Sequence, residues 1–172
     1  MREDANPRGL PVSLSTSRGA DVGSAASKAR LRLWLRVLKV SHIIERELRE
    51  RLRVEFDTTL PRFDVMAALY RAEKGLNMSE LSGVLRVSNG NVTGIVDRLV
   101  DDGHIMRVPV EGDRRAMIVR LTKKGRAHFG ALAEAHEGWV NEILASVDVP
   151  EAEKLIAQLG SIGRRLDQLK AT

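Results

Sequence analysis

The feature that most constrains this chain is a pair of short helical segments joined by a tight turn. Asn77, followed three residues later by Glu80, has the pattern of a capping box and predicts a helix over residues 78–85. Ser88 then predicts a second N-cap. In the segment that follows, apolar residues recur at helical spacing: Val92, Ile95, Val96, Leu99 and Val100. The pattern is typical of a helix-turn-helix, although a helical hairpin without a nucleic-acid role has the same signals.

Two strand-like runs follow the second helix directly. They cover residues 105–110 and 116–121, and a polar turn at 111–115 separates them. A β-hairpin in this position is typical of a winged helix. Its tip carries two adjacent arginines, Arg114 and Arg115, which suit contact with phosphates or entry into a narrow, electronegative minor groove.

Helical patterns flank this winged region on both sides. A long helix is predicted over residues 28–55, Pro61 suits the first turn of a second helix, a long helix covers 122–146, and Pro150 opens a last one. The first 27 residues are rich in Gly, Pro, Ser and Ala, which predicts a flexible tail. We therefore expect a mainly α fold with four parts: an N-terminal tail (1–27), a first helix (28–60), a winged helix-turn-helix region (61–121) and C-terminal helices (122–172).

The amino-acid composition excludes several classes of protein. None of the 172 residues is cysteine, so disulfides, thiolate nucleophiles and cysteine-based zinc sites are excluded. The net charge is +5, and residues 28–60 contribute +4 of it with nine basic and five acidic residues. This indicates an anionic partner, although so small an excess also serves solubility. Apolar runs are too short to cross a membrane and a secretory signal is lacking, so we expect a cytoplasmic location without a membrane partner.

Enzymatic chemistry has no signature in the sequence. It contains no nucleophile–base set, paired-carboxylate pattern or phosphate-cradling glycine loop, so we expect neither an enzyme nor a bound cofactor. Four histidines with nearby acids are the candidate metal ligands: His42, His104, His128 and His136. Because His128 and His136 stand eight residues apart on one predicted helix, they are too distant to share an ion without further ligands. We expect no metal site.

Five motifs run from residue 81 to residue 125: Leu81-x-x-x-Leu85, Asn91-Val92-Thr93-Gly94-Ile95-Val96-Asp97-Arg98-Leu99, Asp102-Gly103, Asp113-Arg114-Arg115-Ala116 and Leu121-Thr122-x-x-Gly125. Together they resemble the MarR (multiple antibiotic resistance regulator) family, and the resemblance extends over residues 28–170. It implies a homodimeric, ligand-responsive transcription factor, usually a repressor, whose first and last two helices form the dimerisation region. A constitutive or architectural DNA-binding protein without an effector is the alternative.

The resemblance assigns the DNA contacts to the second helix of the pair and to the wing. Arg115 matches the arginine of the family's Asp-x-Arg wing motif and would enter the minor groove beside Arg114, with Asp113 orienting it through a charge-assisted hydrogen bond. A structural ion pair at the wing tip is the other interpretation of Asp113 and Arg115. Hydroxyls and helix N-terminal amides suit phosphates, and an asparagine amide can pair with adenine. The candidates on the helix are Ser88, Asn89, Asn91, Thr93 and Arg98. A dimer would place two such helices in successive major grooves of a pseudo-palindromic operator.

The family's usual effector pocket lies between the first helix, the second helix and the winged region. The candidate contacts in this chain are Trp34, Leu38, His42, Arg46 and Phe63. A basic face of the first helix, formed by Arg32, Arg36, Lys39, Arg46 and Arg53, lies close to them. This face is either a solvated outer surface or an anion site for an aromatic carboxylate or an acyl-coenzyme A thioester. A polar residue on the apolar stripe of this helix is more often part of a hydrogen-bonded interface than a ligand contact. Peroxide sensing is excluded because cysteine is absent.

Overall fold

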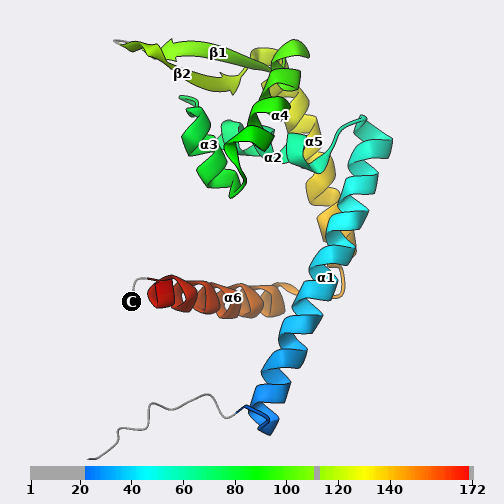
Figure 1. The fold of residues 1–172 in the computed structure, drawn as a ribbon. Helices are drawn as coiled ribbons and strands as arrows, with labels where there is room; N and C mark the ends of the chain where they lie inside the picture. The colour runs from blue at the N-terminus through cyan, green and yellow to red at the C-terminus, as the bar shows by residue number, and fades with distance from the viewer. Residues whose placement is uncertain (1–21, 111–112, 171–172) are drawn as a thin grey trace, which may run out of the picture. The chain divides into compact units, whose positions relative to one another are not determined.

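A computed structural model describes residues 22–110 and 113–170, and in this part of the chain the fold is mainly α with one antiparallel hairpin, as the sequence predicts (Figure 1). The elements are α1 (Ala25–Phe56), α2 (Leu60–Arg71), α3 (Met78–Leu85), α4 (Asn89–Asp101), β1 (Ile105–Val110), β2 (Asp113–Leu121), α5 (Lys123–Ile143) and α6 (Val149–Lys170). Of the predicted tail, residues 1–21 lie outside the described residues. α1 begins ahead of its predicted start, where the Ser24 Oγ accepts a hydrogen bond from the Ser27 amide at 3.1 Å.

The chain divides into two units, residues 1–43 and 44–172, and the boundary falls inside α1. In the first unit, the described part of α1 exposes large apolar side chains, among them Leu31, Trp34 and Leu35 at 54–57% of their area. The second unit contains the remainder of α1 and every other element, and it holds the hydrophobic core.

The core of the second unit forms where the C-terminal part of α1, α2, α3, α4, the hairpin and α5 meet. Its largest fully buried side chains are Leu52, Val65, Met66, Leu69, Leu81, Val92, Val96, Leu99, Ile105 and Leu132. Complete burial of one such aliphatic side chain stabilises the fold by about 1.5–3 kcal/mol. Since three of these residues belong to α4, the core fixes which face of α4 points outward.

Local signals fix the start of α3. The side-chain oxygen of Asn77 accepts a hydrogen bond from the Glu80 amide at 2.9 Å, and a Glu80 carboxylate oxygen accepts one from the Asn77 amide at 2.8 Å. Both interactions of the predicted capping box are therefore present, and they satisfy two backbone donors at the exposed start of the helix.

The hairpin is anchored to the loop ahead of α3. β1 and β2 pair from Ile105 opposite Leu121 outward, with an irregularity between Pro109 and Val110 near the tip. Leu76 adds an isolated bridge to Val119, in which the two residues exchange hydrogen bonds of 3.0 and 2.8 Å. This bridge connects the wing to the loop ahead of α3.

The start of α5 is packed directly against the turn that joins α4 to β1. Thr122 is the N-cap, and its Oγ1 accepts a hydrogen bond from the Gly125 amide at 2.9 Å while donating one to the Gly103 carbonyl at 2.7 Å. A Cβ on Gly125 would lie 1.9 Å from the carbonyl oxygen of His104. The Leu-Thr-x-x-Gly motif is thus a close backbone contact between α5 and the base of the wing.

Helix α6 contributes no buried residue. Its apolar stripe is 49–67% exposed and consists of Leu155, Ile156, Leu159, Ile162, Leu166 and Leu169. Among the described residues, no helix is long and apolar enough to span a lipid bilayer.

Candidate nucleic-acid interface

Helix α4 has one buried face and one polar face. Val92, Val96 and Leu99 are completely buried, whereas Asn91, Thr93 and Arg98 are exposed. Because successive residues of a helix are rotated by about 100°, the exposed side chains flank the buried stripe, with Asn91 and Arg98 on one side of it and Thr93 on the other. The predicted DNA-contact positions of α4 whose side chains the structure describes therefore point away from the core.

The N-terminal end of α4 presents polar groups at the surface. Ser88 is the exposed N-cap, and its side chain makes no capping hydrogen bond to the first turn. The amides of Asn91 and Val92 donate to the Ser88 carbonyl at 3.2 and 3.3 Å. Asn89 is the first residue of α4, and its predicted side-chain contact lies outside what the structure describes. Backbone amides at a helix N-terminus attract phosphate groups.

The turn between α3 and α4 is tight because one residue adopts a left-handed conformation. Arg86 has φ 56° and ψ 38°, and its amide donates to the Gly83 carbonyl at 3.3 Å. The adjacent Val87 amide donates to the Ser82 carbonyl at 3.3 Å. The reversal places α4 across α3, as in a helix-turn-helix.

The wing places the predicted Asp-x-Arg motif beside the hairpin tip. β2 begins at Asp113, which pairs with Val110, so the strand starts three residues before its predicted beginning at Ala116. Residues 111–112 lie outside the described part of the chain, as do the side chains of 113–116. The predicted roles of Asp113, Arg114 and Arg115 therefore stay predictions.

An ion pair links α4 to the wing. The Arg107 guanidinium on β1 donates to the Asp97 carboxylate on α4. Both side chains are partly exposed, at 39% and 50%, so the pair contributes little to stability. Sequence reasoning did not identify this pair, because only the fold brings these two residues together.

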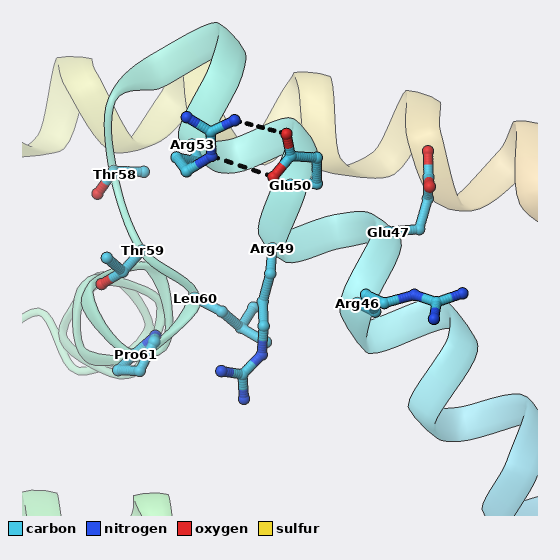
Figure 2. Close-up of a pocket in the computed structure, with 9 residues that line it drawn as sticks. All are labelled: Arg46, Glu47, Arg49, Glu50, Arg53, Thr58, Thr59, Leu60 and Pro61. Atoms are coloured by element: carbon cyan, nitrogen blue, oxygen red, sulfur yellow. Dashed lines mark hydrogen bonds and ion pairs between the residues drawn. The ribbon is translucent and has the colours of Figure 1, made fainter.

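A surface pocket of about 560 Å³ lies between α1 and the start of α2 (Figure 2). It is lined by Arg46, Glu47, Arg49, Glu50, Arg53, Thr58, Thr59, Leu60 and Pro61. Arg53 donates two hydrogen bonds to Glu50, at 3.0 and 2.6 Å, and this guanidinium lowers the pKa of the Glu50 carboxyl. Arg46 and Arg49 extend in different directions, so the three guanidinium groups do not converge on one point (Figure 2).

A second pocket, of about 410 Å³, is lined by residues of α1, α2, α3 and α4 and includes the polar N-terminal end of α4. Its lining consists of Glu45, Arg49, Leu60, Pro61, Asp64, Leu85, Val87, Asn91 and Ile95. Asn91 is thus both a predicted DNA contact and part of a pocket wall. Burial raises the pKa of Asp64, and the opposing influence of His136 is smaller.

The predicted effector contacts are not brought together by the second unit. Trp34, Leu38 and His42 belong to the first unit, where Trp34 and His42 are exposed and Leu38 is partly buried. Arg46 lines the pocket of Figure 2. Phe63 is 9% exposed and belongs to the core, where its ring stacks on His136 with a centroid distance of 4.6 Å.

Three of the four histidines pack against another ring, whereas His42 is exposed. His104 stacks on His128 with ring centroids 4.5 Å apart, whereas His136 stacks on Phe63. Within residues 22–110 and 113–170, no group of three or more His, Asp or Glu side chains is arranged to hold a metal ion.

Comparison with known proteins identifies the family. Residues 58–117 match the model of the MarR family. The regulator PecS of Dickeya dadantii, described as an HTH-type transcriptional regulator, is 31% identical over 130 residues, which are 74% of this chain and 78% of PecS. The chain belongs to the MarR family.

Two further relatives extend the similarity. The transcriptional activatory protein BadR of Rhodopseudomonas palustris is 29% identical over 91% of this chain and 90% of BadR. The crystal structure of a mutant MarR of Escherichia coli complexed with operator DNA has a TM-score of 0.68 and 26% identity, and it covers 81% of this chain and 99% of that protein. These relatives are transcriptional regulators and not enzymes, which agrees with the expectation from the sequence.

Proposed function

We propose that this MarR-family protein is a homodimeric repressor that binds a pseudo-palindromic operator through α4 and the wing and is released by a small organic anion. The observation that carries the proposal is the amphipathic α4. Val92, Val96 and Leu99 of its apolar face are completely buried, and its N-terminal half exposes Asn91 and Thr93. A relative of the same fold is known in complex with operator DNA.

In this proposal, each part of the interface has a distinct role. Ser88, Thr93 and the first amides of α4 contact phosphates, while the Asn89 and Asn91 amides read base edges in the major groove. Arg98, later on the helix, contacts the DNA backbone. Arg115 of the wing enters the minor groove next to Arg114, and Asp113 orients it.

Dimerisation follows from apolar surface that a monomer would leave in water. The stripe of α6 exposes six large aliphatic side chains, and the N-terminal part of α1 exposes others. An apolar stripe of this length is typical of a protein–protein interface. We assign it to a second copy of the chain, which would hold two copies of α4 one helical turn of DNA apart.

Fluorescence anisotropy with DNA from the protein's own promoter region tests the DNA-binding part. Arg115→Ala should weaken binding about tenfold to hundredfold, since a groove contact contributes about 1–3 kcal/mol. Arg120→Ala is the matched control, because Arg120 is an exposed arginine at the other end of the same strand. Both variants should remain dimers by light scattering. Equal affinities of the Arg115→Ala variant and the wild type would contradict the assignment.

The effector part is supported by the cationic residues around the pocket of Figure 2. Arg46, Arg49 and Arg53 give this pocket guanidinium groups that can bind carboxylates or phosphates bidentately. We expect an aromatic carboxylate or an acyl-coenzyme A thioester to release the protein from DNA, and Arg46→Gln to raise the concentration required. If neither class of compound changes DNA affinity, the protein is a constitutive DNA binder.

A promoter fusion tests the direction of regulation. Deletion of the regulator should raise expression from its own promoter region, and the released state should do the same. Lower expression after deletion would instead make the protein an activator, as the name of BadR describes that relative.

A further inference from the structure

Two stacked histidines occupy the joint between α4, the wing and α5. The rings of His104 and His128 lie 4.5 Å apart at an angle of 17°. His104 stands between α4 and β1, and its amide donates to the Leu99 carbonyl at 2.9 Å. Its carbonyl accepts a hydrogen bond from the Thr122 amide at 2.9 Å, at the start of α5. His128 belongs to α5. The stacked rings therefore connect α5 to the turn between α4 and β1, the first strand of the wing.

The surroundings of this pair are rich in cations. Arg62 approaches from α2 and Lys124 from α5, whereas Asp102 supplies the one carboxylate that acts on the pair among the residues that the structure describes. Asp102 is already engaged, because its carboxylate accepts from Arg62 and its carbonyl accepts from Lys124 Nζ at 2.8 Å. Among the described residues, the buried Nδ1 of His104 has no hydrogen-bond partner, and neither has the buried Nε of Arg62. A proton on either ring would thus add a third positive charge to a site with little means of compensating it.

We propose that the His104–His128 pair is a proton-sensitive joint that loosens the connection between α4 and the wing when the pH falls. Two protonated imidazoles in face-to-face contact repel each other, and both face Arg62 and Lys124. Gly125 is packed against the backbone of His104, so the start of α5 and the turn after α4, which carry the two rings, are in direct contact and repulsion between the rings acts on this contact. The joint changes the relative orientation of the two DNA-contacting elements, and its effect on DNA binding rests on the proposed function.

The direction of the pH effect follows from the two pKa values. Burial lowers the pKa of both histidines below the ordinary value of 6.5, and the neighbouring cations lower them further. Folding therefore favours the neutral imidazoles. Their contribution to the free energy of unfolding is complete above about pH 6.5 and is lost as the pH falls below it. For each histidine, a pKa that is one unit lower in the folded than in the unfolded chain lowers the folded-to-unfolded ratio about tenfold once the pH is below both pKa values.

The test compares the full-length wild type with His128→Gln, His136→Gln and the double variant His104→Gln/His128→Gln. Titration of the imidazole C–H signals by NMR should show that His128→Gln raises the pKa of His104. His136→Gln is the matched control, because it removes another partly buried histidine of α5 that stacks elsewhere, and it should leave the pKa of His104 unchanged. Identical titration of His104 in all variants would overturn the proposal.

The functional consequence is measured as operator affinity at pH 7.5 and 5.5. We expect the wild type to bind about tenfold more weakly at pH 5.5, and the double variant to change by no more than about twofold. Equal acid weakening in both proteins overturns the regulatory role while leaving the proposed function intact. If the NMR coupling is present but operator DNA is bound at neither pH, the proposed function fails and the proton-sensitive joint stands.

Discussion

The contact between Gly125 and the base of the wing predicts a large loss of stability for Gly125→Ala. A Cβ at this position would lie 1.9 Å from the His104 carbonyl oxygen and 2.8 Å from the carbonyl carbon. Ordinary van der Waals contact begins at 3.4 Å, so the backbone must separate by about 1.5 Å. The atoms in contact belong to the main chain, and a side-chain rotation cannot relieve the clash.

The magnitude follows from what this separation breaks. The His104 carbonyl accepts from the Thr122 amide at 2.9 Å and from the Thr122 Oγ1 at 3.3 Å, and each lost hydrogen bond costs about 1 kcal/mol. Overpacking of a closely packed contact adds about 1–3 kcal/mol. Alanine returns about 1 kcal/mol through its higher helix propensity. We expect a net decrease in the free energy of unfolding of about 2–4 kcal/mol.

The assay is urea unfolding followed by circular dichroism at constant protein concentration. Gly130→Ala is the matched control, because Gly130 lies on the same helix and a Cβ there meets no atom within 4 Å. That variant should be neutral or more stable by up to about 1 kcal/mol. Equal stability of Gly125→Ala and Gly130→Ala would contradict the inference that the close backbone contact requires glycine at position 125.

Three further substitutions test the scaffold of the winged region. Asn77→Ala removes the capping box with Glu80 and should lower the free energy of unfolding by about 1 kcal/mol, measured by urea unfolding, whereas an unchanged midpoint would mean that the cap is not formed in solution. Leu99→Ala empties a fully buried position on α4 and should cost about 2–5 kcal/mol, and a smaller loss would indicate that the core collapses around the cavity. Asp64→Asn should raise the melting temperature at pH 7 but not below pH 3.8. Burial raises the pKa of Asp64, so the ionised carboxyl destabilises the fold as the pH rises, and a lower melting temperature at pH 7 would contradict this sign.

Elements marked by local signals could be predicted from the sequence. The capping pattern at Asn77 and the apolar period of the following segments predict α3 over residues 78–85 and α4 from Asn89, and the structure confirms both. The capping oxygen and its acceptor amide are three residues apart, so no long-range contact is needed to form them. The wing hairpin is equally clear, although pairing extends β2 to Asp113, beyond the apolar run that indicated the strand.

Contacts between distant residues could not be predicted in the same way. Arg62 meets Asp102 and His104 meets His128 only after α2, α4 and α5 have packed together. Phe63 illustrates the same limit for the predicted effector contacts. An apolar residue on a helical stripe has the same pattern whether it lines a ligand pocket or the core, and the structure places this ring in the core. Sequence periodicity gives the face of a helix but not the element that covers that face.

Glutamates of α1 pair with some of its arginines and partly neutralise the basic character of this helix. The sequence places most of the net charge in residues 28–60 and predicts a basic face that is either a solvated surface or an anion site, formed by Arg32, Arg36, Lys39, Arg46 and Arg53. In the second unit, Arg49 pairs with Glu45 and Arg53 with Glu50, each one helical turn away. Such exposed pairs contribute little to stability, so an anion can replace the glutamates at small cost. The glutamates also repel any anion, and this repulsion increases with the charge of the anion. The basic excess of residues 28–60 therefore does not by itself select a multiply charged ligand over a single carboxylate.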